Sequence, residues 1–424
     1  MRSAAWGRMA AAAVFFVDGA ALGSWWPRIP AVREALHLTP GRLGLALLGV
    51  GLGGLVGALG VVPLLVRIPA RVVAPATGLA LLVVLPWVGV APTWAVLTGV
   101  LVLAGVADGA TDVSMNTLAA ELELATGRSL MSGMHAGWSL GAVTGAVAAT
   151  AAAAGHVSVT AQLAGTCLVL GALAVAASVQ LSRTRLSHGP EQRSTSAKGS
   201  RMPVSRRVLL LGFLVLVAAV VEDAPASWSA VYLRDAGAGP ALAAAGLVGF
   251  SGGMTLGRLA GDRLFVRLGA AAVVRSGAVL AGLGTTVGLA VGRPVAAAIG
   301  FTLAGLGASA FFPGVFSAAG RNPDMPPAQA LSFVGLLARV GFLLAPPTVG
   351  LLADRTGLRV ALVLVPLAAL VVAVGARPDL LDRSGPGSGT HAYGDSHTHA
   401  YGDRDTHAYG ETAPFRDGSV RPGG

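Results

Sequence analysis

The chain has 424 residues, of which 54% are hydrophobic and 12% are charged, and its formal net charge is +10. A soluble globular domain carries about 25% charged residues, so half that share beside so much apolar sequence excludes most water-soluble enzyme classes and indicates a membrane protein. The basic residues lie in short segments between apolar runs, which is typical of membrane topology and not of nucleic-acid binding.

Apolar stretches of about 20 residues, the length that a transmembrane helix needs, follow one another from the first residues onward. They predict twelve spans near 8–25, 43–65, 72–90, 94–118, 130–153, 160–182, 207–226, 241–261, 271–292, 295–317, 328–352 and 359–376. An even number of spans puts both termini on one side, and most of the 30 basic residues then lie on that side. The positive-inside rule therefore predicts a multi-pass protein of the bacterial cytoplasmic membrane with both termini in the cytoplasm.

The chain divides into two similar halves around a polar, Ser- and Arg-rich stretch at 183–206. When the second half is laid over the first, LAGVADGATD at 103–112 matches LAGLGASAFF at 303–312. Parallel repeats of six spans are typical of one transporter architecture. We expect a six-helix bundle at 1–182, a flexible cytoplasmic loop at 183–206 and a second six-helix bundle at 207–376.

The last segment, 377–424, is polar and contains an eight-residue repeat, THAYGDSH, THAYGDRD, THAYGETA, at 390–413. Such a composition predicts a disordered cytoplasmic tail. The repeat supplies histidines but no cysteine, and we expect neither a metal site nor another cofactor.

Several segments resemble proteins of the major facilitator superfamily. GRLAGDR at 257–263, followed by Arg267, resembles the loop motif after the eighth span of that superfamily. Further segments resemble its bacterial fucose-permease-like branch, and within it the YbjJ-type inner-membrane proteins: SWWPRIPAVREAL (24–36), DVSMNTLAAELELATGRSLMSGMHAGWSLGA (112–142), SWSAVYLRDAG (227–237) and APPTVGLLADRTGLR (345–359). The resemblance covers residues 8–376 and implies an all-α major facilitator fold of twelve helices in two pseudo-repeats, with transport by alternating access.

Three polar residues form a stripe along the fourth predicted span. Asp108, Asp112 and Asn116 follow one another at intervals of four residues, so they share one helix face. Two carboxylates one turn apart in a low-dielectric site cannot both ionise cheaply, and a proton-coupling site requires this property. The resemblance implies the same role for Asp112, because the fucose permease carries an acid at the matching position. The alternative is that these acids hydrogen-bond neighbouring helices and never titrate.

Asp18 in the first span and Glu222 in the seventh occupy similar places in the two halves. Each is followed by glycine or proline and by tryptophan, and interrupted spans at matching positions favour a binding site at the membrane midplane. We therefore include both acids among the proton-coupling candidates. In the alternative interpretation they lie near the outer interface, where water solvates a charge.

The substrate is expected to contact polar and aromatic side chains of the same spans. The candidates are Asn116, His135, Trp138, Ser139, Trp25, Phe311 and Phe312. His135 lies one turn from Ser139, and the resemblance implies that it occupies a polar cavity position. The alternative is a histidine that is satisfied within the core. Phe312 falls where the first half has Asp112, so Phe311 and Phe312 are expected to form an aromatic wall facing the acids.

Charged residues mark the expected gate. Arg258 and Arg263, with Asp262 beside them, form a charge network at the end of the eighth span that is expected to hold one state of alternating access. Arg339 is the one basic residue inside a predicted span. It is expected to pair with an acid or an anionic substrate, or to reach the cytoplasmic surface.

The leading hypothesis is a proton-coupled symporter that brings in a sugar-like or other small polar solute. The acidic, aromatic and amide-poor spans leave a proton-coupled exporter of organic cations or drugs as the alternative. A third hypothesis is a membrane sensor that uses the tail as its contact. The expected partners are a small-molecule substrate, protons and the lipid bilayer, for a monomer that binds no nucleic acid and is not an enzyme.

Overall fold

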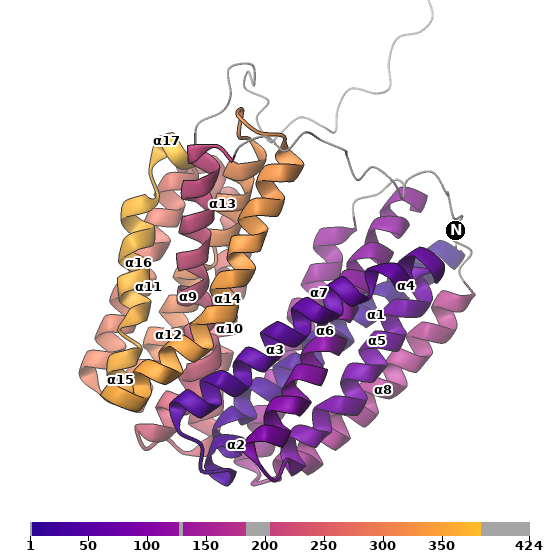
Figure 1. The fold of residues 1–424 in the computed structure, drawn as a ribbon, viewed down its shortest axis with the longest axis horizontal. Helices are drawn as coiled ribbons and strands as arrows, with labels where there is room; N and C mark the ends of the chain where they lie inside the picture. The colour runs from indigo at the N-terminus through magenta and orange to yellow at the C-terminus, as the bar shows by residue number, and fades with distance from the viewer. Residues whose placement is uncertain (1, 127–129, 184–203, 383–424) are drawn as a thin grey trace, which may run out of the picture. The chain divides into compact units, whose positions relative to one another are not determined.

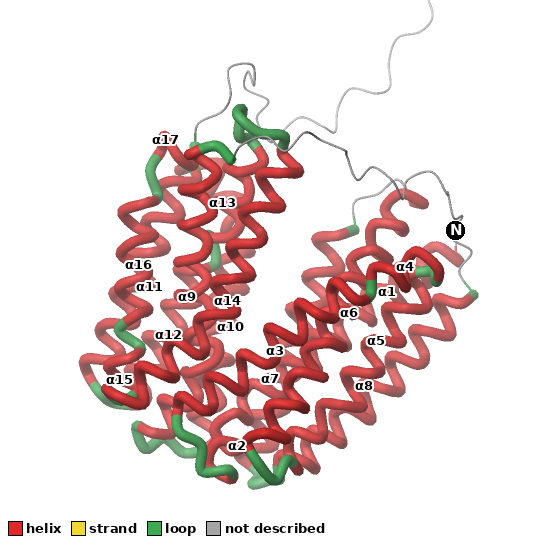
Figure 2. The backbone as a smooth tube through the Cα atoms, in the orientation of Figure 1, coloured by secondary structure: helices red, strands yellow, loops and turns green. Residues whose placement is uncertain are grey.

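Helices make up all of the regular structure in the part of the chain that this computed structural model describes, residues 2–126, 130–183 and 204–382 (Figure 1, Figure 2). Twelve helical stretches are long and apolar enough to cross a membrane, so the predicted all-α polytopic fold is confirmed. Most of the expected loop at 183–206 and the whole repeat at 390–413 lie outside the described residues. So do the side chains of residues 2–5, 132, 262, 327 and 328.

The first half contains ten helical segments in the described residues. They are α1 (Arg2–Trp25), η1 (Trp26–Arg28), α2 (Ile29–Ala35), α3 (Pro40–Gly60), α4 (Val62–Arg67), α5 (Ala70–Val84), η2 (Leu85–Val90), α6 (Trp94–Thr126), α7 (Met131–Ala154) and α8 (Val159–Ser182). Within this half, α1 packs along α7 and α8, and α6 packs along α3 and α5.

The second half continues with helices that pack in a similar way. They are α9 (Arg206–Asp235), α10 (Pro240–Leu268), α11 (Ala270–Val291), α12 (Pro294–Ala308), α13 (Phe311–Gly320), α14 (Pro327–Thr356), α15 (Leu358–Ala361), α16 (Leu364–Gly375) and α17 (Pro378–Leu381). Here α12 packs along α10 and α11, and α9 packs along α14 and α16. The domain boundaries at 182 and 207 stay a prediction.

Prolines lie close to the breaks in the first and tenth spans, although α14 runs through Pro346 and Pro347. A proline lacks the N–H of a helix and crowds the carbonyl four residues earlier. Pro27 and Pro30 follow the end of α1, which passes through the short η1 turn into α2. Within the tenth span, Pro294–Gly320, the helix breaks after Ala308 and resumes at Phe311 as α13, which contains Pro313. By contrast, α9 runs through Pro225 without a break, so the interruption expected in both halves is present only in the first.

The internal repeat is visible in the loops that follow the first span of each half. The backbone N–H groups of His37 and Leu38 donate to Glu34 and Arg33, and those of the loop after α9 repeat this pattern. His37 and Gly237, at the same place in the two loops, both have left-handed φ angles of 48° and 87°. The sequence match between the halves is therefore also a match of backbone conformation.

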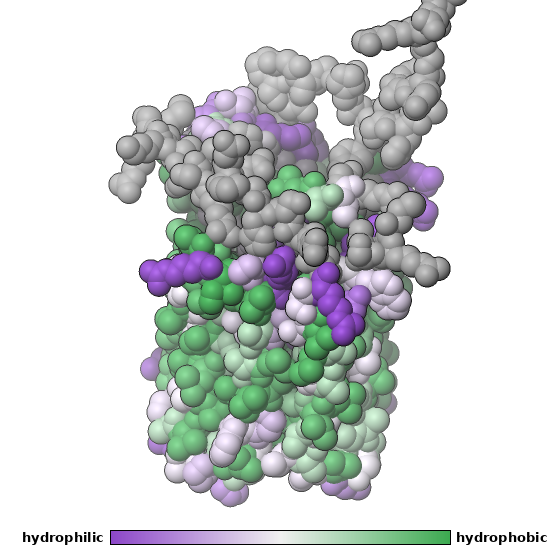
Figure 3. Space-filling model, turned by 90° about the vertical axis from the view of Figure 1, so that its right-hand side faces the viewer, coloured by the Kyte–Doolittle hydropathy of each residue, from purple (hydrophilic) through white to green (hydrophobic). Residues whose placement is uncertain are grey.

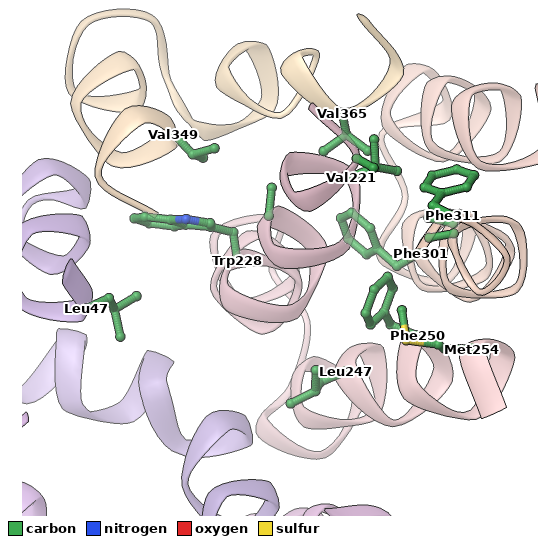
Figure 4. Packing of buried hydrophobic residues seen from close by; sticks show 14 of the residues in the cluster. Leu47, Val221, Trp228, Leu247, Phe250, Met254, Phe301, Phe311, Val349 and Val365 are labelled. Carbon is green, nitrogen blue, oxygen red and sulfur yellow. The ribbon is translucent and has the colours of Figure 1, made fainter. Parts of the chain in front are cut away.

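The halves contact each other along α3 and α14, along α7 and α10, and through η1 and α2 against α9 and α10. Trp228 of α9 is fully buried near this junction, with Leu47 of α3 and Val349 of α14 on either side (Figure 4). We call the end of the helices that carries residues 26–41, 91–93, 155–158, 234–240, 292–293 and 354–358 the closed end.

The outer surface suits a lipid environment. Figure 3 shows an apolar surface with polar residues gathered towards the ends of the helices. On α8, Leu168 and Val169 are 77% and 70% exposed, which is costly in water but favourable against acyl chains.

Candidate functional site

Glycines let α1 and α7 approach each other closely. A Cβ at Gly19 would meet the carbonyl oxygen of Trp138, and one at Gly141 would meet the carbonyl oxygen of Phe16. The pattern repeats one turn later at Gly23. Small residues four apart are the sequence signal for close helix packing in membranes, and the sequence analysis missed this signal on α1 and α7.

This close packing brings Asp18 to the side chain of Trp138. Nε1 of Trp138 donates a hydrogen bond to Oδ2 of Asp18 at 2.9 Å. Asp18 is 2% exposed, and its Oδ1 has no hydrogen-bond partner within the described residues. A buried carboxyl oxygen without a donor is a place that favours a proton or a donor from a ligand.

The stripe predicted on α6 lies near Asp18. Nδ2 of Asn116 donates to Oδ1 of Asp112 at 3.0 Å and to the Asp112 backbone oxygen at 2.8 Å. The charges of Asp108 and Asp112 both act on Asp18. Asp18 of α1 and the two acids of α6 thus lie within electrostatic range of one another, although not close enough to share a metal ion, and we call these three residues the acid cluster.

Glu222, the fourth predicted coupling acid, belongs to the second half and has a different partner. Its Oε1 accepts a hydrogen bond from Nη2 of Arg258 at 3.4 Å, and its side chain is 18% exposed. The neighbouring Asp223 accepts one from Ser227 at 3.2 Å. The structure thus groups three of the four predicted acids.

Two basic groups act on Asp112, one from each half. They are His135 on α7 and Arg339 on α14. Both side chains are exposed, and the ring of His135 meets Phe15 edge-on with 5.4 Å between the centroids. The hydroxyl of Ser139 donates to the backbone oxygen of His135 at 3.0 Å, so it is engaged within its own helix. Arg339 links the acid cluster electrostatically to the second half.

The predicted aromatic residues differ in how deeply they are buried. Phe312 is half-buried and stacks on Phe316 and Phe342, with centroid separations of 6.2 and 5.3 Å. Phe311 is 0% exposed and lies in the core of the second half (Figure 4), and Trp25 is 3% exposed. Both rings are therefore packed in the interior in this structure, and the contact of Phe311 and Trp25 with the substrate stays a prediction.

The predicted gate at the end of the eighth span is only partly described. Arg258 pairs with Glu222 of α9, as given above, and Arg263 is exposed. The side chain of Asp262 lies outside the described residues. The network of these three residues stays a prediction.

Two ion pairs at the closed end, absent from the sequence analysis, join the halves directly. Nη1 of Arg33 lies 2.8 Å from both carboxylate oxygens of Asp235. Arg234 donates to Glu34 through Nε at 2.8 Å and through Nη2 at 3.1 Å. We call these two pairs the clasp. Their sequence signal is an adjacent basic and acidic residue after the first span of each half.

Asp354 makes a further contact between the halves at the closed end. Its carboxylate accepts a hydrogen bond from the backbone N–H of Gly41 at 2.8 Å and from the hydroxyl of Thr39 at 3.2 Å. These donors belong to the first turn of α3, where backbone N–H groups have no partner within the helix and a negative charge is favoured. The clasp and Asp354 together hold the closed end shut.

The chemistry available at the site is proton exchange and binding of a polar ligand. Acids within a membrane segment are costly unless they are paired or exchange a proton, and the acid cluster has few fixed partners. Among the residues that the structure describes, no group of three or more His, Cys, Asp or Glu side chains is placed to hold a metal ion.

Comparison with protein families and sequences gives a consistent result. The family model of the Major Facilitator Superfamily matches residues 11–325. An uncharacterized transporter of Sinorhizobium fredii is 34% identical over 372 residues, which cover 86% of this chain and 95% of that protein. An uncharacterized MFS-type transporter of Yersinia pestis is 32% identical over 365 residues, covering 86% of this chain and 93% of that protein.

Solved structures share the fold at low sequence identity. The nucleoside transporter NupG aligns with a TM-score of 0.67 at 13% identity, covering 87% of this chain and 98% of that one. The E. coli fucose:proton symporter FucP aligns with a TM-score of 0.58 at 16% identity, covering 87% of this chain and 97% of that one.

Proposed function

This chain belongs to the Major Facilitator Superfamily and is a transporter of small solutes, not an enzyme, and we propose that it is a proton-coupled symporter. We place it in the fucose-permease-like branch, among the YbjJ-type proteins. The moving bodies are the six-helix bundles at 1–182 and 207–376, and the protein works as a monomer in the cytoplasmic membrane of a bacterium.

The closed end faces away from the cytoplasm in this proposal. The distribution of arginine supports that orientation, because most of the basic residues lie at the opposite end or in the segments that follow it. The clasp then joins the halves at the outer face. Alternating access requires the clasp to break when the outer face opens.

The observation that carries proton coupling is the gathering of Asp18, Asp108 and Asp112 beside a cation of the other half. When Asp112 is ionised, it attracts Arg339 on α14. A proton on Asp112 removes this attraction between the two halves. Protonation is thereby linked to the movement of one half against the other, which is what coupling requires.

The solute contacts the half-buried and exposed polar groups near the acid cluster. Asn116 and His135 supply hydrogen-bonding groups from the first half, and the rings of Trp138 and Phe312 supply aromatic faces from the two halves. A stacked ring beside hydrogen-bonding groups suits a sugar-like or other small polar solute. The structurally similar transporters of nucleosides and of fucose with a proton support this class of solute.

A proton-coupled exporter of organic cations is the second candidate. The acid cluster of the first half and the stacked rings of Phe312 and Phe342 in the second favour a positively charged ligand. The same acids would then exchange a proton for the cation, and the direction of proton movement would be reversed.

The test uses purified protein in liposomes that enclose a pH-sensitive dye, to which pools of sugars or of organic cations are added. Symport predicts acidification of the lumen with a sugar pool, and this signal is lost in Asp112→Asn. The matched control is Asp324→Asn, which removes an exposed acid from the loop before α14 and is expected to behave as the wild type. Lumenal loss of protons with a cation pool would instead establish the exporter.

A further inference from the structure

A cavity of about 210 Å³ lies at the closed end, between the two halves. The first half lines it with residues of η1, α2 and the segment between α7 and α8. The second half lines it with residues of α9 and α10. The cavity is therefore built at a place where the two halves meet, apart from the acid cluster.

One wall of this cavity is a buried cation. Arg28 is 5% exposed, and its Nη2 donates to the backbone oxygen of Val157 at 2.6 Å. Its Nε and Nη1 have no hydrogen-bond partner within the described residues. Both nitrogens are themselves buried, and because the charge of a guanidinium is costly to bury without a partner, Arg28 lacks the counter-charge that an anion at this wall of the cavity would supply.

The acid on the cavity wall does not neutralise Arg28. Both carboxylate oxygens of Glu34 accept hydrogen bonds from Arg234, at 2.8 and 3.1 Å. With the lining residue His156 counted as neutral, Arg28 and Arg234 thus carry two positive charges against the one negative charge of Glu34. The cavity has room and charge for one monovalent anion.

We propose that this cavity binds an oxyanion, a carboxylate or a phosphate group, attached to a small apolar body. The planar fork of a guanidinium matches the two oxygens of such a group. The remaining wall is largely apolar, with Ala31, Pro240 and Ala243 among its residues. The anion comes either from solution, as a short monocarboxylate, or from the headgroup of an anionic phospholipid.

An anion held there touches both halves at once. It therefore binds more tightly when the closed end is shut than when the halves have separated, and it shifts the population towards the shut state. This consequence rests on the proposed alternating access, whereas binding itself does not depend on transport or on proton coupling.

The first test measures the thermal unfolding midpoint of the full chain in detergent, with sodium butyrate against sodium chloride at equal ionic strength. Butyrate is expected to raise the midpoint of the wild type and of Arg293→Gln, an exposed arginine of the closed end that does not line the cavity. In Arg28→Gln, which keeps a donor for Val157, butyrate is expected to bind at least about tenfold more weakly.

A second variant keeps the proposal testable if Arg28→Gln does not fold. Ala31→Leu fills the cavity and leaves Arg28 in place, and it is expected to abolish the butyrate shift. A lipid source is tested in nanodiscs of phosphatidylcholine with and without phosphatidylglycerol: stabilisation by phosphatidylglycerol that is lost in both variants assigns the site to a lipid headgroup. The proposal would be overturned if butyrate raised the midpoint no more than chloride and phosphatidylglycerol gave no stabilisation. It would also be overturned if the stabilisation were undiminished in both variants.

Discussion

The two halves share a fold but differ in chemistry at the same positions. Asp108 and Asp112 of α6 correspond to Ala308 and Phe312 of the second half. The first half carries acids on α1 and α6, whereas the second half carries the stacked rings around Phe312 and the cation Arg339, whose charge acts on Asp112. The two halves therefore share one architecture, and a few differences between them place the acids in one half and the stacked rings in the other.

The largest expected effect comes from separating α1 from α7. Gly141→Leu inserts a side chain where a Cβ already meets the carbonyl oxygen of Phe16, so it costs about 1–3 kcal/mol of stability and removes transport. Gly133→Leu on the same helix is the control, because nothing lies within 4 Å of its Cβ. Unfolding midpoints and liposome uptake measure both. Equal behaviour of the two variants would show that the close approach is not needed.

The second-largest effect is expected from removing the hydrogen bond between Trp138 and Asp18 of the acid cluster. Trp138→Phe leaves Oδ2 of Asp18 without its donor, which costs about 1–3 kcal/mol and weakens proton-driven uptake. Trp94→Phe removes a similar bond, from Nε1 to the backbone oxygen of Arg42 at 2.7 Å, at the closed end. We expect both variants to lose stability and only Trp138→Phe to change proton movement. A proton signal unchanged in Trp138→Phe would exclude a role for this bond in coupling.

Substitutions at two adjacent phenylalanines test the difference between a fully buried and a half-buried ring in the second half. Phe311→Leu loses packing in the core and is expected to cost about 1 kcal/mol without changing the solute concentration for half-maximal uptake. Phe312→Leu keeps the stability and weakens solute binding, because its ring is half-buried against Phe342. If Phe311→Leu weakened solute binding and Phe312→Leu only lowered stability, the ring that contacts the solute would have been assigned wrongly.

The clasp gives the smallest expected effect, because partly exposed ion pairs contribute about 0.2–1 kcal/mol each. Glu34→Arg places a second positive charge beside Arg234, and the repulsion is expected to separate the two halves at the closed end. Adding Arg234→Glu restores the ion pair with its charges exchanged. Spin labels at Pro92→Cys and Arg293→Cys, in a Cys167→Ala background, report the distance between the halves there. If the double variant did not return the distance between the labels to its wild-type value, the clasp would have no part in holding the halves together at the closed end.

The sequence predicted the fold well because the membrane imposes long apolar helices and because the repeat leaves matching residues in both halves. It also predicted the α6 stripe, since a spacing of four fixes a helix face. It missed the clasp and the place of Phe311, because pairing across the halves and burial of a ring depend on how distant helices pack. The sequence analysis likewise did not single out Arg28, because its burial and the cavity beside it depend on packing between the halves.

The most direct test of coupling in the first half compares two assays of Asp112→Asn, using a solute that the pools identify. Proton-driven accumulation requires Asp112 to gain and lose its proton, whereas counterflow exchange of labelled for unlabelled solute requires no net proton movement. We predict that the variant loses accumulation and keeps counterflow. Accumulation at the wild-type level would contradict the account and leave the acid cluster a structural feature of the helix packing.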